Sequence, residues 1–284
     1  MSNSFATPLR YPGGKGRLGA WLSDVITENN LNEGCYIEPY AGGAGAAMYL
    51  LSQGKIRNVI INDIDPVIHS FWWSTLNDTQ NFIDMIKNTP VTMDEWRRQR
   101  EIVIEGDARN ITQLGFAGFF LNRTNRSGII KGGVIGGKKQ EGKYKINARY
   151  NPDGLAKRVA NIAQYRDRIA LENLDAIELI NNLNPDNQQN SIVYLDPPYY
   201  KKGGQLYRNY YDHGDHENVA QEVQQLDCPW VVTYDNCEEI RELYEWSSST
   251  EFSLHYSTHL KRPIGKEVCF YGNMEFKTQP YLKR

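Results

Sequence analysis

The residues of this chain best suited to chemistry are Asp196-Pro197-Pro198-Tyr199-Tyr200, which follow the apolar run 192–195. Such a run predicts a buried strand, and open α/β sheets bind ligands at the carboxyl ends of their strands. The two prolines remove two N–H donors and leave carbonyl oxygens as acceptors. Carboxylate, carbonyl and aromatic ring suit a planar group that carries an NH2. A strand end closed by a proline turn is the other interpretation.

A second motif is the glycine-rich turn Pro39-Tyr40-Ala41-Gly42-Gly43-Ala44-Gly45. It lies between a predicted strand that ends at Glu38 and a predicted helix over 46–53, and the next strand, 59–61, is closed by Asn62-Asp63. Glycines let a ligand approach the backbone, and an acid at the second strand end can bind ribose hydroxyls. Because G-x-G-x-x-G is absent, the turn suits a nucleoside without a pyrophosphate, such as S-adenosylmethionine (SAM). An ordinary α/β turn is the alternative.

Basic residues are concentrated in one quarter of the chain. Residues 97–168 hold 16 of the 32 Lys and Arg and 6 of the 34 Asp and Glu, a net charge of +10 against −2 for the whole chain. A concentrated positive surface is expected for contacts with nucleic-acid phosphates. A solvated helical surface is the alternative.

Composition excludes several classes of protein. No apolar run approaches the roughly 18 residues of a membrane span, and residues 1–10 lack a signal-peptide core. The four cysteines are scattered without CxxC spacing, which indicates free thiols and a cytoplasmic protein. The pairs His213/His216 and His255/His259 have no third partner, so no metal site is expected.

The 284 residues divide by pattern into two parts. Around 70–160 the α/β rhythm is interrupted. Helices are predicted over 71–87, 93–105 and 113–121, a basic turn over 123–128, and a glycine- and lysine-rich mobile hairpin or loop over 129–149. The α/β rhythm then returns. The predicted helices are 176–183, 216–225, which Asp215 can cap, and 238–246. The predicted strands are 169–173, 192–195, 230–234, 251–256 and 267–271, the last two forming an antiparallel pair. The sequence therefore predicts a catalytic domain, 1–69 and 161–284, interrupted by an inserted subdomain, 70–160.

Several segments in this order resemble the Dam-type (D12 class) DNA adenine-N6 methyltransferases. They are Arg10-Tyr11-Pro12-Gly13-Gly14-Lys15, Glu38 to Gly45, Asn62 to Asp65, Phe119 to Arg123 with Ser127-Gly128, and Asp196 to Tyr199. The resemblance covers residues 8 to about 271. It implies a SAM-dependent methyltransferase sheet of Rossmann type, mostly parallel with an antiparallel last strand, and a mainly helical DNA-recognition insert.

The resemblance also implies a mechanism and a set of catalytic residues, Asp196, Pro197, Pro198 and Tyr199. The target adenine leaves the duplex, which costs a few kcal/mol. Asp196 and the Pro197 carbonyl accept the two N6 hydrogens, and Tyr199 stacks on the base. Transfer of the methyl group is direct and in line, so no covalent intermediate is needed.

Cofactor contacts follow from the same resemblance. Tyr11 and Lys15 are expected near the methionine part of SAM, and Asp63 at the ribose. Asp175 is expected at the adenine amine, with a helix cap as the alternative. The full predicted set is Tyr11, Lys15, Glu38, Pro39, Tyr40, Ala41, Gly42, Gly43, Gly45, Asp63, Ile64, Asp175 and Asp196.

The expected partner is double-stranded DNA, with a cognate restriction endonuclease as a possible second partner. The candidate DNA contacts are Arg123, Asn125, Arg126, Lys143 and Arg149. Arginine can pair with guanine and asparagine with adenine, although phosphate contacts predominate in such interfaces. Residues 201–211 either close over the flipped base or form a surface loop.

Two other readings of the sequence remain. The substrate could instead be RNA or a protein amide; an Asn at position 196 and a weaker basic segment would favour the amide. The chain could also be a DNA-binding module that holds SAM without turnover, although the intact Asp63, Asp196 and Tyr199 argue against this.

Overall fold

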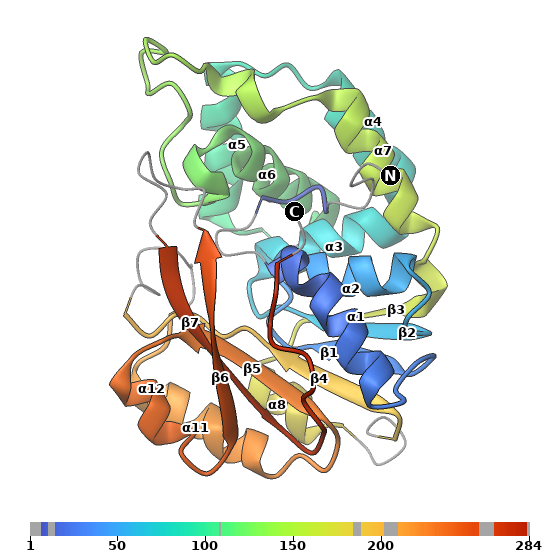
Figure 1. The fold of residues 1–284 in the computed structure, drawn as a ribbon. Helices are drawn as coiled ribbons and strands as arrows, with labels where there is room; N and C mark the ends of the chain where they lie inside the picture. Colours follow the sequence, from blue (N-terminus) through green and yellow to red (C-terminus); the bar gives the residue numbers. More distant parts are fainter. Residues whose placement is uncertain are drawn as a thin grey trace. The chain divides into compact units, whose positions relative to one another are not determined.

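The computed structural model describes residues 7–10, 15–107, 109–183, 189–201, 210–255 and 264–282 (Figure 1). Its internal contacts separate two compact units. The sheet unit comprises Gly13–Ile64 and Arg168–Arg284, and the helical unit comprises Met1–Pro12 and Asp65–Asp167, in each case over the described residues. The roles predicted for the two parts of the chain stay predictions.

Strands of the described residues form one seven-stranded sheet in the sheet unit, in the order β3-β2-β1-β4-β5-β7-β6. The first five in that order pair in parallel, whereas β7 is antiparallel to both β5 and β6. The predicted sheet, mostly parallel with an antiparallel last strand, is confirmed. The strands are β1 (Cys35–Glu38), β2 (Asn58–Asn62), β3 (Ile169–Glu172), β4 (Ser191–Leu195), β5 (Trp230–Asp235), β6 (Ser248–His255) and β7 (Ile264–Gly272).

The strand order reverses between β1 and β4, which are neighbours although β2 and β3 lie on the other side of β1. A reversal of this kind leaves a crevice outside the carboxyl ends of the two strands, where ligands of open α/β sheets bind. Glu38 ends β1, and Asp196 directly follows β4. The topology therefore brings the two predicted motifs to one edge of the sheet.

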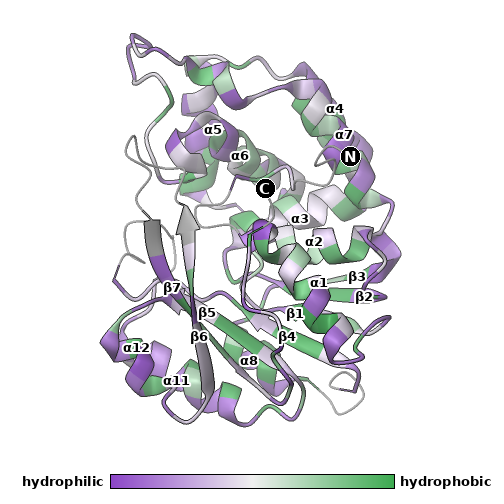
Figure 2. Cartoon of the chain, in the orientation of Figure 1, coloured by the Kyte–Doolittle hydropathy of each residue, from purple (hydrophilic) through white to green (hydrophobic). Residues whose placement is uncertain are grey.

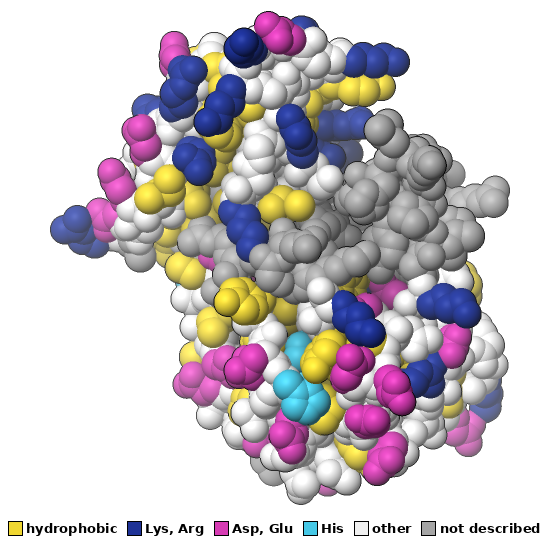
Figure 3. All heavy atoms as spheres, turned by 90° about the vertical axis from the view of Figure 1, so that its left-hand side faces the viewer, with side chains coloured by type: hydrophobic (Ala, Val, Ile, Leu, Met, Phe, Trp, Pro, Cys, Tyr) yellow, Lys and Arg dark blue, Asp and Glu magenta, His cyan; other side chains and the backbone are white. Residues whose placement is uncertain are grey.

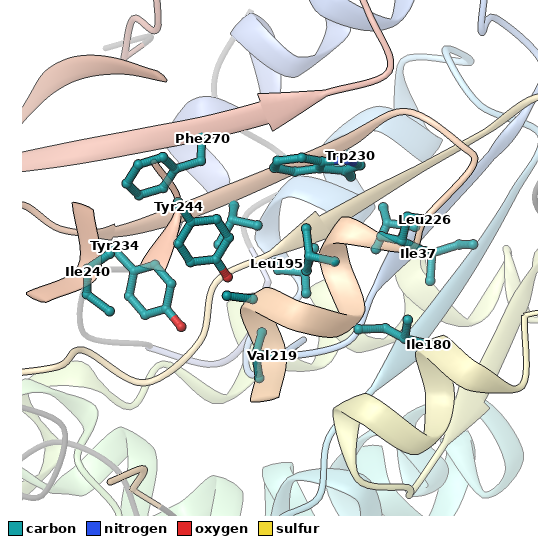
Figure 4. Close-up of a cluster of buried hydrophobic side chains, with 14 of the residues drawn as sticks. Ile37, Ile180, Leu195, Val219, Leu226, Trp230, Tyr234, Ile240, Tyr244 and Phe270 are labelled. Carbon is teal, nitrogen blue, oxygen red and sulfur yellow. The ribbon is translucent and has the colours of Figure 1, made fainter. Parts of the chain in front are cut away.

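The helices of the sheet unit cover strands that are apolar on both faces, as parallel strands require. All five residues of β4 are buried, and Figure 2 shows β4 and β5 with mainly hydrophobic residues. In Figure 4, Tyr234, Tyr244 and Phe270 lie beside one another in this core, with Tyr244 stacked on Phe270 at 4.7 Å between ring centroids. The helices are η1 (Lys15–Leu18), α1 (Gly19–Glu28), α2 (Gly45–Ser52), α8 (Ala176–Asn181), α11 (His213–Gln224) and α12 (Glu238–Leu243).

The helical unit has an aromatic core. Phe71, Phe82, Phe116 and Phe119 pack with ring centroids 5.6 to 6.3 Å apart, and Tyr150 packs on Phe119 at 5.9 Å. Its helices are α3 (Pro66–Asn77), α4 (Thr79–Asn88), α5 (Met93–Glu105), α6 (Ile111–Thr124) and α7 (Pro152–Ala163), with the 3₁₀ turns η2 (Arg126–Gly128) and η3 (Ile146–Arg149); a further turn, η4 (Arg166–Arg168), leads to β3.

Three sequence expectations differ from the structure. The single helix expected over 71–87 is divided at Asp78, whose backbone is not helical (φ −128°, ψ 40°). Helix α11 is capped by Asp212 rather than Asp215, because Asp215 occupies the third helical position and completes a capping box with Asp212. Helices α1 and α7 were not expected from the sequence.

The glycine- and lysine-rich segment is a closed loop rather than a hairpin. Gln140 donates to the carbonyls of Ile135 and Gly137, each at 2.7 Å, and accepts from the Ile146 N–H at 2.8 Å. A single isolated bridge joins Asn125 to Val134. One glutamine side chain therefore ties the loop to itself.

No helix in the described ranges is long and apolar enough to cross a membrane.

Helices α3 and α6 approach each other closely at two glycines. A Cβ at Gly115 would lie 2.4 Å from the Ser70 carbonyl oxygen, and one at Gly118 would lie 2.2 Å from a Val67 methyl group. The first neighbour is backbone and cannot turn away. Glycine at position 115 is therefore required by packing.

Gly115→Ala should lower the free energy of unfolding by about 1–3 kcal/mol, since overpacking outweighs the gain in helix propensity. Gly133→Ala is the matched control, because a Cβ there meets nothing within 4 Å. Urea unfolding followed by circular dichroism measures both variants. Equal stabilities would mean that the two helices do not pack as described.

Candidate active site

Lys15 is the centre of a charged cluster in the sheet unit. Its side chain is only 2% exposed, and its Nζ lies 2.8 Å from Asp196 Oδ1 and 3.2 Å from Glu267 Oε2. The same ammonium lies 3.3 Å from the Tyr199 hydroxyl and 5.2 Å from the centre of the Tyr199 ring. Tyr199 in turn donates to Glu267 Oε1 at 2.8 Å. One cation thus connects the turn before α1 with the end of β4 and with β7.

Asp196 receives a second hydrogen bond on the same oxygen. Thr233 Oγ1 of β5 donates to Asp196 Oδ1 at 3.0 Å. Because the Thr233 proton points to the carboxylate, the Tyr194 hydroxyl 3.0 Å away must donate to Thr233. Both hydrogen bonds that Asp196 receives from described residues end on Oδ1, and its side chain is 19% exposed. The carboxylate is oriented through one oxygen, and its other oxygen is left as an acceptor.

The backbone after the two prolines is held by Asp235, the last residue of β5. The Tyr200 N–H donates to Asp235 Oδ1 at 2.9 Å, and the Lys201 N–H to Oδ2 at 3.1 Å. Pro197 and Pro198 offer no N–H, and these two donors lie two and three residues beyond Pro198. Asp235 therefore fixes the course of the chain directly beyond the predicted catalytic motif.

The glycine-rich turn is bonded to the end of β2. Gly42 (φ 46°) donates its N–H to Asp63 Oδ2 at 2.9 Å, and Ala44 (φ 43°) also has a left-handed backbone. The buried Asn62 side chain donates to the carbonyls of Pro39 and Leu174 and accepts from the Leu174 N–H. Asn62 thereby joins the loops that follow β1, β2 and β3.

Glu38 is buried beside Asp196 at the end of β1. Burial, and to a smaller extent the charge of Asp196, raise the pKa of Glu38 well above its usual range, while a backbone hydrogen bond from Ala47 opposes the shift. Its Oε2 has no hydrogen-bond partner among the residues that the structure describes. A buried polar atom of this kind in a crevice indicates a place for a ligand group.

The remaining predicted cofactor residues lie as follows. Asp175 caps α8, its side chain accepting from the Ile177 N–H, which is the structural alternative named for it. Ile64 is 43% exposed beside Asp63. Gly45 begins α2, and its Cα is 3.3 Å from where a Cβ on Gly16 would lie. Tyr11 lies outside the described residues.

An aromatic group surrounds the buried His216. Its Nδ1 lies 2.9 Å from the Tyr234 hydroxyl, and the rings of Tyr200 and Tyr211 lie 5.2 and 5.5 Å from its ring. Tyr211 also lies within hydrogen-bond distance of Tyr40 of the glycine-rich turn (3.2 Å). This group joins that turn to the segment beyond Tyr199.

Sequence reasoning missed several of these residues. These are Glu267, Thr233, Asp235 and His216, which all lie outside the recognised motifs. Of the four, only Glu267 carries a signal in the sequence. It is an acid at the start of the apolar run 268–271, where a buried strand would not place one without a partner.

The predicted DNA contacts all belong to the helical unit, whose surface carries many Lys and Arg side chains (Figure 3). Arg126, Lys143 and Arg149 are exposed. Asn125 is fully buried: it accepts from the Trp96 indole at 2.8 Å and donates to the carbonyls of Ile129 and Ile130. Its amide holds the loop and does not face solvent.

Arg123 belongs to a group of arginines with Arg10, Arg149 and Arg158. Burial, and then the three neighbouring charges, lower the pKa of Arg123 to about 9. Its hydrogen bonds go to the carbonyls of Arg149 (2.8 Å) and Pro8 (3.3 Å), and within the described ranges none of the four pairs with a carboxylate. Such a group favours an anion nearby.

No set of three His, Cys, Asp or Glu side chains that could hold a metal ion occurs in the described part of the chain. The strand order, the switch point between β1 and β4, and a glycine-rich turn bonded to an acid at the end of β2 are features of the SAM-dependent methyltransferase fold. Among proteins with that fold, the chain belongs to the D12 class N6 adenine-specific DNA methyltransferases, which residues 11–261 match. SAM is the methyl donor of such enzymes.

Among characterised proteins, the chain is similar to the Type II methyltransferase M.MjaIII of Methanocaldococcus jannaschii, with 25% identity over 67% of this chain and 68% of the relative. Solved structures with some likeness include PH1948, a candidate RNA methyltransferase from Pyrococcus horikoshii (9% identity, 93% of this chain and 84% of that chain, TM-score 0.42). Another is the rRNA methyltransferase aviRa from Streptomyces viridochromogenes (13% identity, 92% and 85%, TM-score 0.37). At these scores neither structure bears on the substrate.

His216 should make the stability of the protein depend on pH. Burial lowers its pKa to about 4, although the charges of Asp235 and Asp215 oppose the shift. Because the unfolded chain binds this proton near pH 6.5, the stability is complete above that pH and falls as the pH drops toward 4, by on the order of 2 kcal/mol.

Unfolding by urea between pH 4 and 7 measures this effect. His216→Phe should flatten the loss of stability with falling pH, whereas the exposed control His213→Gln should follow the wild type. A pH dependence in His216→Phe as steep as in the wild type would show that His216 is not the group responsible.

Proposed function

We propose that this protein methylates the N6 amine of adenine at a specific site in duplex DNA, with Asp196-Pro197-Pro198-Tyr199 receiving the amine. The observation that carries this proposal is the orientation of Asp196. Its Oδ1 is held by Lys15 and Thr233, at 2.8 and 3.0 Å, and its second oxygen lies next to a proline pair without N–H groups. One carboxylate oxygen and the Pro197 carbonyl can therefore accept the two hydrogens of an NH2 group.

These two acceptors would prepare the amine for reaction. The nitrogen lone pair of adenine is delocalised into the ring, and hydrogen bonds from both N6 hydrogens favour a tetrahedral nitrogen with a localised lone pair. Tyr199, held through its hydroxyl by Glu267, supplies a ring on which the base can stack. Positioning and electrostatics then provide most of the catalysis. The base must leave the duplex first, at a cost of a few kcal/mol.

SAM supplies the methyl group on a sulfonium. The residues that fit this cofactor are Asp63 for the ribose hydroxyls, Ile64 for a face of the adenine, and Glu38 for the positively charged part. In support, Asp63 is bonded to the glycine-rich turn and Glu38 has a buried oxygen without a described partner. Asp175 can approach the adenine amine while it caps α8. Tyr11 is proposed from sequence alone.

Lys15 was expected at the methionine carboxylate. Its ammonium instead contacts Asp196 and Glu267. We therefore propose that Lys15 mainly orients the catalytic motif through Asp196. A contact between Lys15 and the methionine carboxylate would be made in addition to its contacts with Asp196 and Glu267.

For DNA, we propose that the exposed Arg126 and Lys143 contact phosphates or base edges, and that Arg123 and Arg149, with Arg10 and Arg158, bind a phosphate. The lowered pKa of Arg123 supports this, because a phosphate would relieve the repulsion among the four guanidinium groups. Asn125 is proposed as a support for the loop.

A cognate restriction endonuclease and a cytoplasmic, DNA-associated location are also proposed. The similarity to a Type II methyltransferase supports the first, and the four free cysteines support the second. Protection of methylated DNA against an endonuclease encoded beside this protein tests the partnership.

Asp196→Ala should lower methyl transfer by at least about 100-fold and leave SAM affinity within about threefold, since the carboxylate acts on the amine. Transfer of labelled methyl groups to a mixed-sequence duplex, with nucleoside analysis, measures the rate and identifies N6-methyladenine. Asp227→Ala, an exposed acid, is the control.

Lost SAM affinity with normal turnover at saturating SAM would contradict this role of Asp196. Label found only in RNA or protein would replace the proposed substrate, and duplex binding without transfer by the wild type would indicate a binding module.

Arg126→Ala and Lys143→Ala should each weaken duplex binding and reduce the slope of log affinity against log salt by about 1, as expected for one phosphate contact. The exposed Lys277→Ala is the matched control. Binding measured between low and high salt gives the slopes. Slopes unchanged in both variants would remove these residues from the DNA interface.

A further inference from the structure

Glu267 is a buried acid that the proposed chemistry does not yet use. It lies on β7 opposite Asp235 of β5, and its side chain is fully buried. Oε1 accepts the Tyr199 hydroxyl at 2.8 Å, and Oε2 lies 3.2 Å from the Lys15 ammonium. It therefore contacts Tyr199 of the catalytic motif and Lys15, which holds Asp196 of that motif.

The charges of the cluster explain why a second acid is present. Asp196 and Glu267 present two carboxylates to the single ammonium of Lys15. If Asp196 were the only partner, Lys15 would compensate its charge at 2.8 Å in a site shielded from water, where such interactions are strong. With Glu267 present, Lys15 interacts with a second carboxylate and compensates less of the negative charge of Asp196.

We infer that Glu267 is a positioning residue for methyl transfer. It balances the charge of Lys15, so that Asp196 keeps negative charge for the amine, and it holds the Tyr199 ring in place. During transfer the N6 nitrogen becomes positively charged, and the negative charge that Asp196 keeps stabilises it. This inference rests on the proposed function of Asp196 and Tyr199.

Stability alone is a poor reason for this arrangement. A buried ion pair is often no more stable than well-packed apolar side chains of similar volume. The neighbouring residues Val268, Cys269 and Phe270 of β7 are buried and fill the sheet unit with apolar or weakly polar groups. Of the residues 267–270, only position 267 is an acid, and it is the position that contacts Lys15 and Tyr199.

Three variants separate the charge of Glu267 from its hydrogen bond. Glu267→Gln keeps an acceptor for Tyr199 but removes the charge. Glu267→Asp keeps the charge on a shorter side chain. Tyr199→Phe keeps the ring but removes the hydroxyl. Glu251→Gln on β6, an exposed acid paired with Arg241, is the control for the loss of a strand carboxylate.

The experiment is single-turnover transfer to a duplex that holds the recognition site, at saturating SAM, with SAM affinity and thermal unfolding measured in parallel. Glu267→Gln should slow transfer at least about tenfold and change SAM affinity less than about threefold. Glu267→Asp should be faster than Glu267→Gln, and Tyr199→Phe should be slowed less than Glu267→Gln. Glu251→Gln should match the wild type.

A folded Glu267→Gln with wild-type transfer, or one faster than Glu267→Asp, would overturn the inference. If Glu267→Gln does not fold, the rates of Glu267→Asp and Tyr199→Phe decide. A folded Glu267→Asp variant without measurable transfer then contradicts the charge role. Failure of the proposed function itself is distinct, because then the wild type forms no N6-methyladenine.

Discussion

The site depends on the burial of one ammonium group. Lys15 has a side chain that is 2% exposed, and a cation so far from water is stable only with anionic partners at short range. Those partners come from the end of β4 and from β7, so residues near the start, the middle and the end of the sequence must meet at one point. Closing the sheet with β7 beside β5 is therefore a condition for forming the site as well as the core.

The parallel strands impose the second constraint. Their carboxyl ends share one edge of the sheet, so short polar segments after β1, β2, β4 and β5 become neighbours without any long loop. Asn62 and Asp235 then fasten these segments to one another through backbone groups. These bonds set the positions of the polar segments relative to the strands.

The sequence predicted the parts of this arrangement that are local. The glycine-rich turn, the acid after β2 and the proline motif after β4 each follow an apolar strand, and their order indicated the sheet. What the sequence could not show was which distant side chains complete the site. Thr233 lies on β5 and Glu267 on β7, and their contacts with Asp196 and Lys15 depend on strand order. The burial of Asn125 was also not predictable, since a polar residue in a basic turn predicts a surface contact.

The loop closed by Gln140 has a consequence for substitutions within it. Its internal hydrogen bonds run between residues 135 and 146, from Gln140 to Ile135, Gly137 and Ile146 and from Lys145 back to Gln140. These bonds are made by backbone groups and by two side chains, so the exposed positions between them are free to vary in identity. Substitutions at these exposed positions leave the internal bonds in place, and with them the course of the backbone from 135 to 146.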